Sequence, residues 1–146
     1  MKKEAPAAAR ILLVDDNARG LETRKLILVD HGYSVDTART GEEAWETFQS
    51  NHFDVVMTDY KLSGMDGFEL IRRIRAADTP TRVVLLSGFL VGFDEKTSGA
   101  DEVIQKSSRE VTEMLRVLKR LTTHPRRRQP ASAKGIATPQ AKSQAV

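Results

Sequence analysis

The sequence predicts an α/β fold in which a five-stranded parallel sheet is covered by helices on both faces. Short apolar runs alternate with longer stretches of helical periodicity along residues 10–121 of the 146-residue chain. The runs are rich in β-branched residues and show no sustained polar alternation, which is typical of parallel strands buried on both faces. Five such strand–helix repeats predict a doubly wound sheet with right-handed crossovers.

Five apolar runs are the predicted strands. Four of them are each followed by polar residues, and the fifth, at residues 33–37, is less apolar than the others. In chain order the predicted strands are Ile11–Val14, Tyr33–Thr37, Val55–Met57, Val83–Leu86 and Val103–Ile104.

The stretches between these runs predict helices. Asn17 is a suitable N-cap for the first helix and His31-Gly32 a suitable end, while Thr79-Pro80 ends the third. Only Asp94–Ser98 remains for the fourth helix, which should therefore be shortened. The residues expected to be buried are Ala18, Leu21, Leu28 and Val29 in the first helix; Ala44, Trp45 and Phe48 in the second; Leu70, Ile71, Ile74 and Ala77 in the third; and Val111, Met114, Leu115, Leu118 and Leu121 in the last.

Both ends of the chain differ in composition from residues 10–121. Residues 122–146 contain three prolines, few large apolar residues and no periodicity, so we expect a disordered tail, and we expect the same of residues 1–9. The net charge of +3 arises in this tail, which holds five basic residues and no acidic one, and residues 1–121 carry −2. No element for specific nucleic-acid binding is recognisable, and a solvated tail is the simplest interpretation.

The composition also excludes several classes of protein. The chain has no cysteine, so disulfides and thiolate metal sites are excluded. No segment approaches the roughly 20 apolar residues that span a bilayer, and we expect a cytoplasmic protein without a membrane span. No Gly-x-Gly-x-x-Gly or Walker motif is present, so nucleotide binding has little support.

Polar residues of complementary chemistry follow four of the predicted strands. The first strand is followed by Asp15 and Asp16, the third by Asp59, the fourth by Ser87 and the fifth by Lys106. Ligands bind outside the carboxyl ends of the strands in an open parallel sheet, so these groups should meet at one edge. Each one alone is compatible with a helix cap, a turn or a solvated charge, but the joint arrangement favours a site.

The three carboxylates would repel one another unless a cation is bound. Oxygen ligands without histidine or cysteine indicate Mg²⁺ or Mn²⁺ rather than zinc. Mg²⁺ prefers few carboxylates together with a phosphate oxygen, and Lys106 and Ser87 would complete the surroundings of a phosphoryl group.

Four segments, in the same order, resemble the motifs of response-regulator receiver domains. They are Ile11–Asn17, Val55–Gly67, Val83–Gly88 and Gly99–Lys106. The resemblance implies a receiver domain at residues 10–121 with strand order 2-1-3-4-5. It also implies a phosphorylation-dependent switch rather than an enzyme, in which Asp59 accepts a phosphoryl group from a sensor histidine kinase or a phosphotransfer protein.

The resemblance also implies individual roles. Asp16, Asp59 and the backbone carbonyl of Lys61 would ligate Mg²⁺ directly, and Asp15 would act through water. Lys106 would pair with one phosphoryl oxygen and Ser87 would donate a hydrogen bond to another. Phosphorylation would change the face formed by the fourth helix, the fifth strand and the fifth helix, which a downstream protein would read.

Some features depart from the family pattern or leave other functions open. Ser63 and Ser107 stand where proline is common, although neither removes a group needed for phosphorylation. An apolar cluster at residues 89–93 suggests the hypothesis that phosphorylation reorganises residues 88–99. A phosphatase with an Asp nucleophile would carry a second Asp at the position of Lys61, and a receiver-like module could bind partners without phosphorylation.

Overall fold

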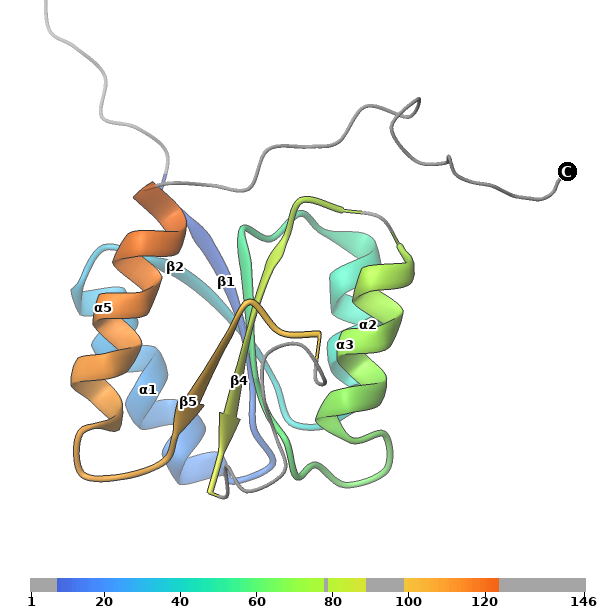
Figure 1. Ribbon diagram of the computed structural model, residues 1–146, viewed down its shortest axis with the longest axis horizontal. Helices are drawn as coiled ribbons and strands as arrows, with labels where there is room; N and C mark the ends of the chain where they lie inside the picture. The colour runs from blue at the N-terminus through green and yellow to red at the C-terminus, as the bar shows by residue number, and fades with distance from the viewer. Residues whose placement is uncertain (1–7, 78, 89–98, 124–146) are drawn as a thin grey trace, which may run out of the picture.

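The computed structural model describes residues 8–77, 79–88 and 99–123, which form a five-stranded parallel sheet covered by helices on both faces (Figure 1). The sheet has the order β2-β1-β3-β4-β5, so both the predicted fold class and the implied strand order are confirmed. The strands are β1 (Arg10–Val14), β2 (Ser34–Ala38), β3 (Val55–Asp59), β4 (Arg82–Ser87) and β5 (Glu102–Gln105). The helices are α1 (Ala18–Asp30), α2 (Gly41–Ser50), α3 (Gly67–Ala76) and α5 (Glu110–Thr123).

Three expectations concern residues that the structure describes only in part or not at all. The shortened fourth helix at Asp94–Ser98 and the apolar cluster at residues 89–93 lie outside the described residues. Most of both predicted flanking segments also lies outside them. Helix α5 continues to Thr123, beyond the boundary at residue 121 that the sequence predicts.

Two hydrophobic cores lie on opposite faces of the sheet. Helices α1 and α5 cover one face, and α2 and α3 cover the other (Figure 1). Successive residues of a strand point to opposite faces, so Ile11 and Leu13 join the first core whereas Leu12 and Val14 join the second. All four side chains are fully buried, which explains why the strand reads as a continuous apolar run.

The ends of helix α1 match the prediction. The side chain of Asn17 accepts a hydrogen bond from the backbone N–H of Gly20 at 2.9 Å. Residue His31 caps the other end, and Gly32 follows with a φ of 95°, a left-handed conformation that glycine adopts without a steric cost.

The predicted buried faces of the helices need correction. Leu21 and Leu28 are buried in α1, but Val29 is 49% exposed because it lies about 100° further round the helix than Leu28. In α5, Val111 is 39% exposed although it lies only about 20° round the helix from the buried Leu118; it is the second residue of the helix. Trp45 is only half-buried, and its ring stacks on that of Phe48 with the centroids 5.9 Å apart. Of the remaining residues, Ala18 and Ala77 are exposed although predicted to be buried, and Val117 is buried although not predicted.

Gly67 allows helix α3 to start close to the end of β3. Its backbone N–H donates to the carbonyl oxygen of Tyr60 at 2.9 Å. A Cβ atom at this position would lie 2.5 Å from the carbonyl oxygen of Asp59 and 3.0 Å from the Cα of Tyr60. Side chains do not make contacts this short with backbone atoms, so the absence of a side chain sets the path of the chain around Asp59.

We expect Gly67→Ala to lower the free energy of unfolding by about 1–3 kcal/mol, the usual cost of an overpacked site. Helix propensity alone would favour alanine by about 1 kcal/mol, so a loss would identify the close backbone contact as its cause. Chemical denaturation followed by circular dichroism measures the change. Gly88→Ala is the control, because a Cβ there meets no described atom within 4 Å; equal effects of the two substitutions would contradict this explanation.

Candidate functional site

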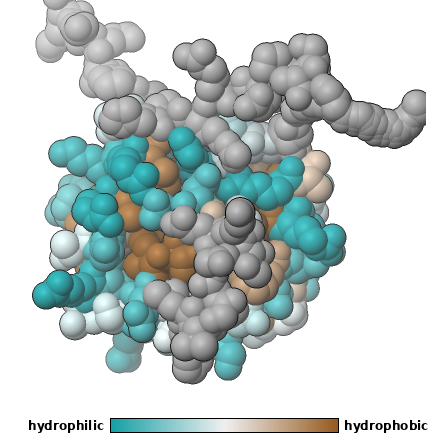
Figure 2. Space-filling view, in the orientation of Figure 1, coloured by the Kyte–Doolittle hydropathy of each residue, from teal (hydrophilic) through white to brown (hydrophobic). Residues whose placement is uncertain are grey.

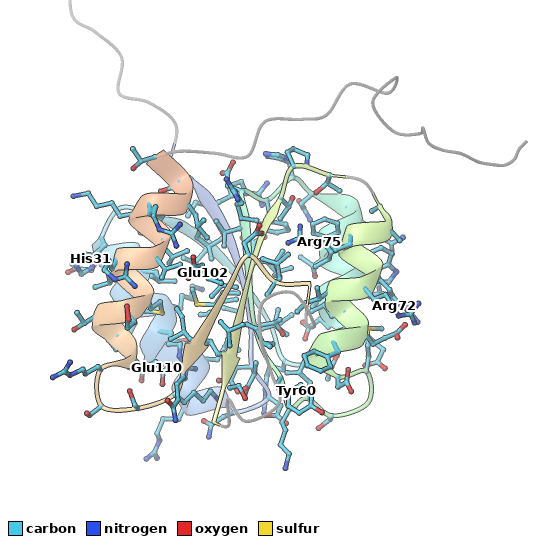
Figure 3. The ribbon with its side chains drawn as sticks, in the orientation of Figure 1. His31, Tyr60, Arg72, Arg75, Glu102 and Glu110 are labelled. Carbon is cyan, nitrogen blue, oxygen red and sulfur yellow. The ribbon has the colours of Figure 1, made fainter. Side chains whose placement is uncertain are left out.

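Backbone hydrogen bonds between strand ends bring the predicted site residues together. The N–H of Tyr60, directly after β3, donates to the carbonyl of Leu86 at 2.9 Å. The N–H of Lys106, directly after β5, donates to the carbonyl of Ser87 at 2.8 Å. Figure 3 shows Tyr60 at the same end of the sheet as Glu110, the first residue of α5. The carboxyl ends of β3, β4 and β5 are therefore held side by side.

The three predicted carboxylates form a cluster at this edge. Asp15, Asp16 and Asp59 each offer a carboxylate oxygen, and these atoms lie within 4.8 Å of one another. Asp15 is 1% exposed and Asp59 is 7% exposed, whereas Asp16 is open to solvent. An all-oxygen set with one solvent-facing member fits a hard divalent cation that keeps part of its water shell, as Mg²⁺ does.

Lys106 neutralises part of this charge. Its Nζ atom lies 2.7 Å from Asp59 Oδ2 and 3.8 Å from Asp15 Oδ2. Burial nevertheless raises the pKa of the Asp59 carboxyl above its ordinary value, and the charge of Asp15 adds to this increase. The hydrogen bond and charge of Lys106 act in the opposite direction without cancelling it. Asp59 therefore holds its negative charge less readily than an aspartate in solution.

A small cavity of about 210 Å³ opens beside Asp59. It is lined by Asp59, Tyr60, Lys61, Ser87, Gly88 and Lys106. The structure thus places the predicted hydroxyl and ammonium groups in the same cavity as the buried carboxylate. Its volume is below the range of roughly 300–1,000 Å³ that encloses organic ligands of drug size, but it is sufficient for a phosphoryl group.

A larger cavity of about 780 Å³ lies elsewhere, between the C-terminal ends of α2 and α3. Phe53 and Thr81, which precede β3 and β4, line it, so it lies at the amino ends of the strands. None of the predicted site residues contributes to it.

Arg24 is a charged residue of this site that the sequence did not identify. Its Nη1 atom lies 2.6 Å from Asp15 Oδ2, and its Nη2 atom lies 2.5 Å from Glu110 Oε2. Although burial alone would lower the pKa of Arg24, hydrogen bonds and charges from Glu110 and Asp15 raise it. One sequence feature could have identified Arg24. It lies three residues after Leu21 and four before Leu28, which places it on the buried face of α1.

Comparison with known proteins agrees with the receiver-domain fold that the sequence predicted. The family model described as the response regulator receiver domain matches residues 11–119. The chain therefore belongs to the receiver-domain family of two-component response regulators, whose members generally are signalling domains rather than enzymes.

Two curated relatives illustrate the similarity. The gliding motility regulatory protein of Myxococcus xanthus is 34% identical over 126 residues, covering 82% of this chain and 16% of the relative. The transcriptional regulatory protein TrcR of Mycobacterium tuberculosis is 35% identical over 120 residues, covering 79% of this chain and 47% of the relative. The chain spans less than half the length of both relatives.

Solved structures show the same fold. The response regulator TrrA of Thermotoga maritima, in complex with Mg²⁺-BeF, is 34% identical with a TM-score of 0.71, covering 77% of this chain and 98% of that one. The chemotaxis response regulator CheY4 of Vibrio cholerae is 28% identical with a TM-score of 0.71, covering 78% of this chain and 98% of that one.

We expect Asp59→Asn to stabilise the protein at neutral pH in the absence of divalent cations. A pKa that is raised in the folded state means that stability is greatest below the unfolded pKa of aspartate and is lost as the pH rises through the folded pKa. Asparagine removes that loss, so the variant should melt a few degrees higher at pH 7, where about 1 kcal/mol corresponds to roughly 4 °C.

Thermal unfolding in EDTA between pH 4 and pH 8 measures this difference, which should shrink toward pH 4 as Asp59 becomes protonated. Asp36→Asn is the control, because Asp36 is half-exposed and pairs only at the surface with Arg10. A lower melting temperature for Asp59→Asn at pH 7 would show that the Lys106 ion pair outweighs the cost of burial.

Proposed function

We propose that this protein is a phosphorylation-dependent switch in which Asp59 accepts a phosphoryl group from a sensor histidine kinase or a phosphotransfer protein. The observation that carries this proposal is the contact between Lys106 Nζ and Asp59 Oδ2, beside an acidic cluster and within a cavity large enough for a phosphoryl group. Receiver-domain membership supports the same reaction. We also propose a cytoplasmic location, where such donors act.

The reaction breaks the P–N bond of a phosphohistidine and forms a P–O bond to Asp59, and the imidazole leaves with the electron pair. Lys106 is then placed to balance the charge of one phosphoryl oxygen, and the hydroxyl of Ser87 would donate a hydrogen bond to another. These groups lie on three adjacent strand ends, so the catalytic contribution is mainly positioning and charge neutralisation.

The acidic cluster is the proposed Mg²⁺ site. Asp16, Asp59 and the backbone carbonyl of Lys61 would hold the ion directly, and Asp15 would act through water. When bound, Mg²⁺ supplies positive charge to the carboxylates and to the transferred phosphoryl oxygens. The Mg²⁺-BeF complex of the related TrrA structure supports this assignment.

The two other functions have less support. An aspartate-based phosphatase needs a general acid at the position of Lys61, and this residue is an exposed lysine. A module that acts without phosphorylation would have no use for a buried carboxylate, a lysine and a hydroxyl that line one small cavity. The convergence of these groups favours phosphorylation.

The proposed output surface includes β5 and α5, together with the segment between β4 and β5 that lies outside the described residues. Figure 2 shows hydrophobic surface over β5, the edge strand, surrounded by hydrophilic side chains. A protein partner could bury such a surface, and we propose a downstream protein rather than specific nucleic acid.

Among the described residues, no helix is long and apolar enough to cross a membrane.

The direct test is the mass of the protein after incubation with a small-molecule phosphodonor and Mg²⁺. We expect the wild type to gain one phosphoryl group and Asp59→Asn to gain none. Asp16→Ala should label at least tenfold more slowly, because it removes a cation ligand, and EDTA should have the same effect on the wild type. Equal labelling of the wild type and Asp59→Asn would disprove the assignment.

The end of the domain at Thr123, where helix α5 ends, has its own test. Deleting residues 124–146 leaves all described elements in place and should change the rate of labelling less than twofold, because the site is complete without them. A similar melting temperature would accompany this result. A large loss of labelling in a folded truncated protein would show that the tail contributes to the phosphorylated state.

A further inference from the structure

Arg24 connects the acidic cluster to the first turn of α5. Its guanidinium contacts Asp15 on one side and Glu110 on the other, with Nε also donating to Glu110 Oε2 at 2.6 Å. The side chains of Arg24, Glu110 and Asp15 are 11%, 14% and 2% exposed. Because the three groups are largely removed from water, solvent screens their interactions less than those of a surface pair.

Gly20 and Asn17 lie beside this guanidinium and Asp15. A Cβ atom at Gly20 would lie at a slightly short 3.3 Å from Arg24 Nη1 and at an ordinary contact distance of 3.6 Å from Asp15 Oδ2, so glycine leaves a little more room beside the ion pair. Both oxygens of Asp15 already have donors: Oδ1 accepts from the N–H of Asn17 at 2.9 Å, and Oδ2 accepts from Arg24.

We propose that Arg24 is a positioning residue that competes with the bound cation for Asp15, and that Glu110 sets the strength of this competition. The inference rests on the proposed Mg²⁺ site. It adds a regulatory link: cation occupancy is coupled to the first turn of α5 through the ion pairs that join Asp15, Arg24 and Glu110.

The coupling follows from the charges. With Glu110 present, the charge of Arg24 is shared between two carboxylates, and only part of it opposes a cation at Asp15. Without Glu110, the whole guanidinium charge is directed at Asp15 and opposes cation binding more strongly. Coupling between two sites is reciprocal. If Glu110 changes the free energy of cation binding, then the cation changes the free energy of the contacts of Glu110 by the same amount.

A double-mutant cycle tests the proposal. Mg²⁺ is titrated into ¹⁵N-labelled protein, and the amide signals of residues 59–61 give the dissociation constant. We expect Glu110→Gln to weaken Mg²⁺ binding roughly three- to tenfold, and Arg24→Gln to bind Mg²⁺ at least as tightly as the wild type. Adding Glu110→Gln to Arg24→Gln should produce no further change, because Glu110 acts only through Arg24.

The amide signals of residues 110–113 provide a second readout in the same titration. In the wild type they should shift with the same dissociation constant as the site, and in Arg24→Gln they should not respond. Glu113→Gln is the matched control, since Glu113 lies on the same helix, has a half-exposed side chain and pairs with Arg116; its Mg²⁺ affinity should equal that of the wild type. If Arg24→Gln does not fold, Arg24→Met replaces it in the cycle.

The outcomes separate the two proposals. A wild-type protein that binds no Mg²⁺ would overturn the proposed function. A wild type that binds Mg²⁺ with the same affinity as Glu110→Gln would overturn the link through Arg24 and leave the proposed function intact. Weaker binding by Arg24→Gln would also overturn the competition, because Arg24 would then support the cation ligands instead of opposing the cation.

Discussion

The repulsion among three carboxylates at one edge of the sheet is the constraint on which the site depends. Asp59 and Asp15 are almost fully buried, and burying unpaired charges of the same sign is costly. The chain supplies two cations against this cost: Lys106 faces both carboxylates, and Arg24 faces Asp15. The carboxylates are therefore held in place by the protein itself before any ligand binds.

The position of Lys106 depends in turn on how β5 joins the sheet. The carboxylate of Asp101 accepts hydrogen bonds from the N–H of Val83 at 2.8 Å and from Arg75 Nη2 at 2.8 Å. Arg75, labelled in Figure 3, also donates from Nε to the carbonyl of Gly99 at 2.9 Å. These contacts fix the residues just before β5, and the strand then carries Lys106 to the other end of the sheet. A salt bridge remote from the site thus adds to the β4–β5 pairing in holding the register on which the site depends.

The sequence predicts the sheet, the three aspartates and Lys106, but not the ion pairs that Arg24 makes with Asp15 and Glu110. Strand ends are predictable because a buried parallel strand is a short apolar run, and the residue after it lies at the functional edge by topology. Arg24 was not predicted because helical periodicity gives the face on which a residue lies, but not the partner of its side chain. Val29 was placed wrongly because it lies beside the buried face of α1, and Val111 because periodicity does not show that a residue in the first turn of a helix can be exposed.

The charge balance of the whole ion-pair chain indicates why Glu110 belongs to the site. The linked ionic groups comprise two cations, Lys106 and Arg24, and four acids, Asp15, Asp16, Asp59 and Glu110. Their formal charges sum to −2, which one divalent cation would balance. Arg24 and Glu110 together contribute no net charge. They therefore change how strongly Asp15 attracts a cation without changing that balance, and they place this control on α5, outside the group of residues that would touch the phosphoryl group.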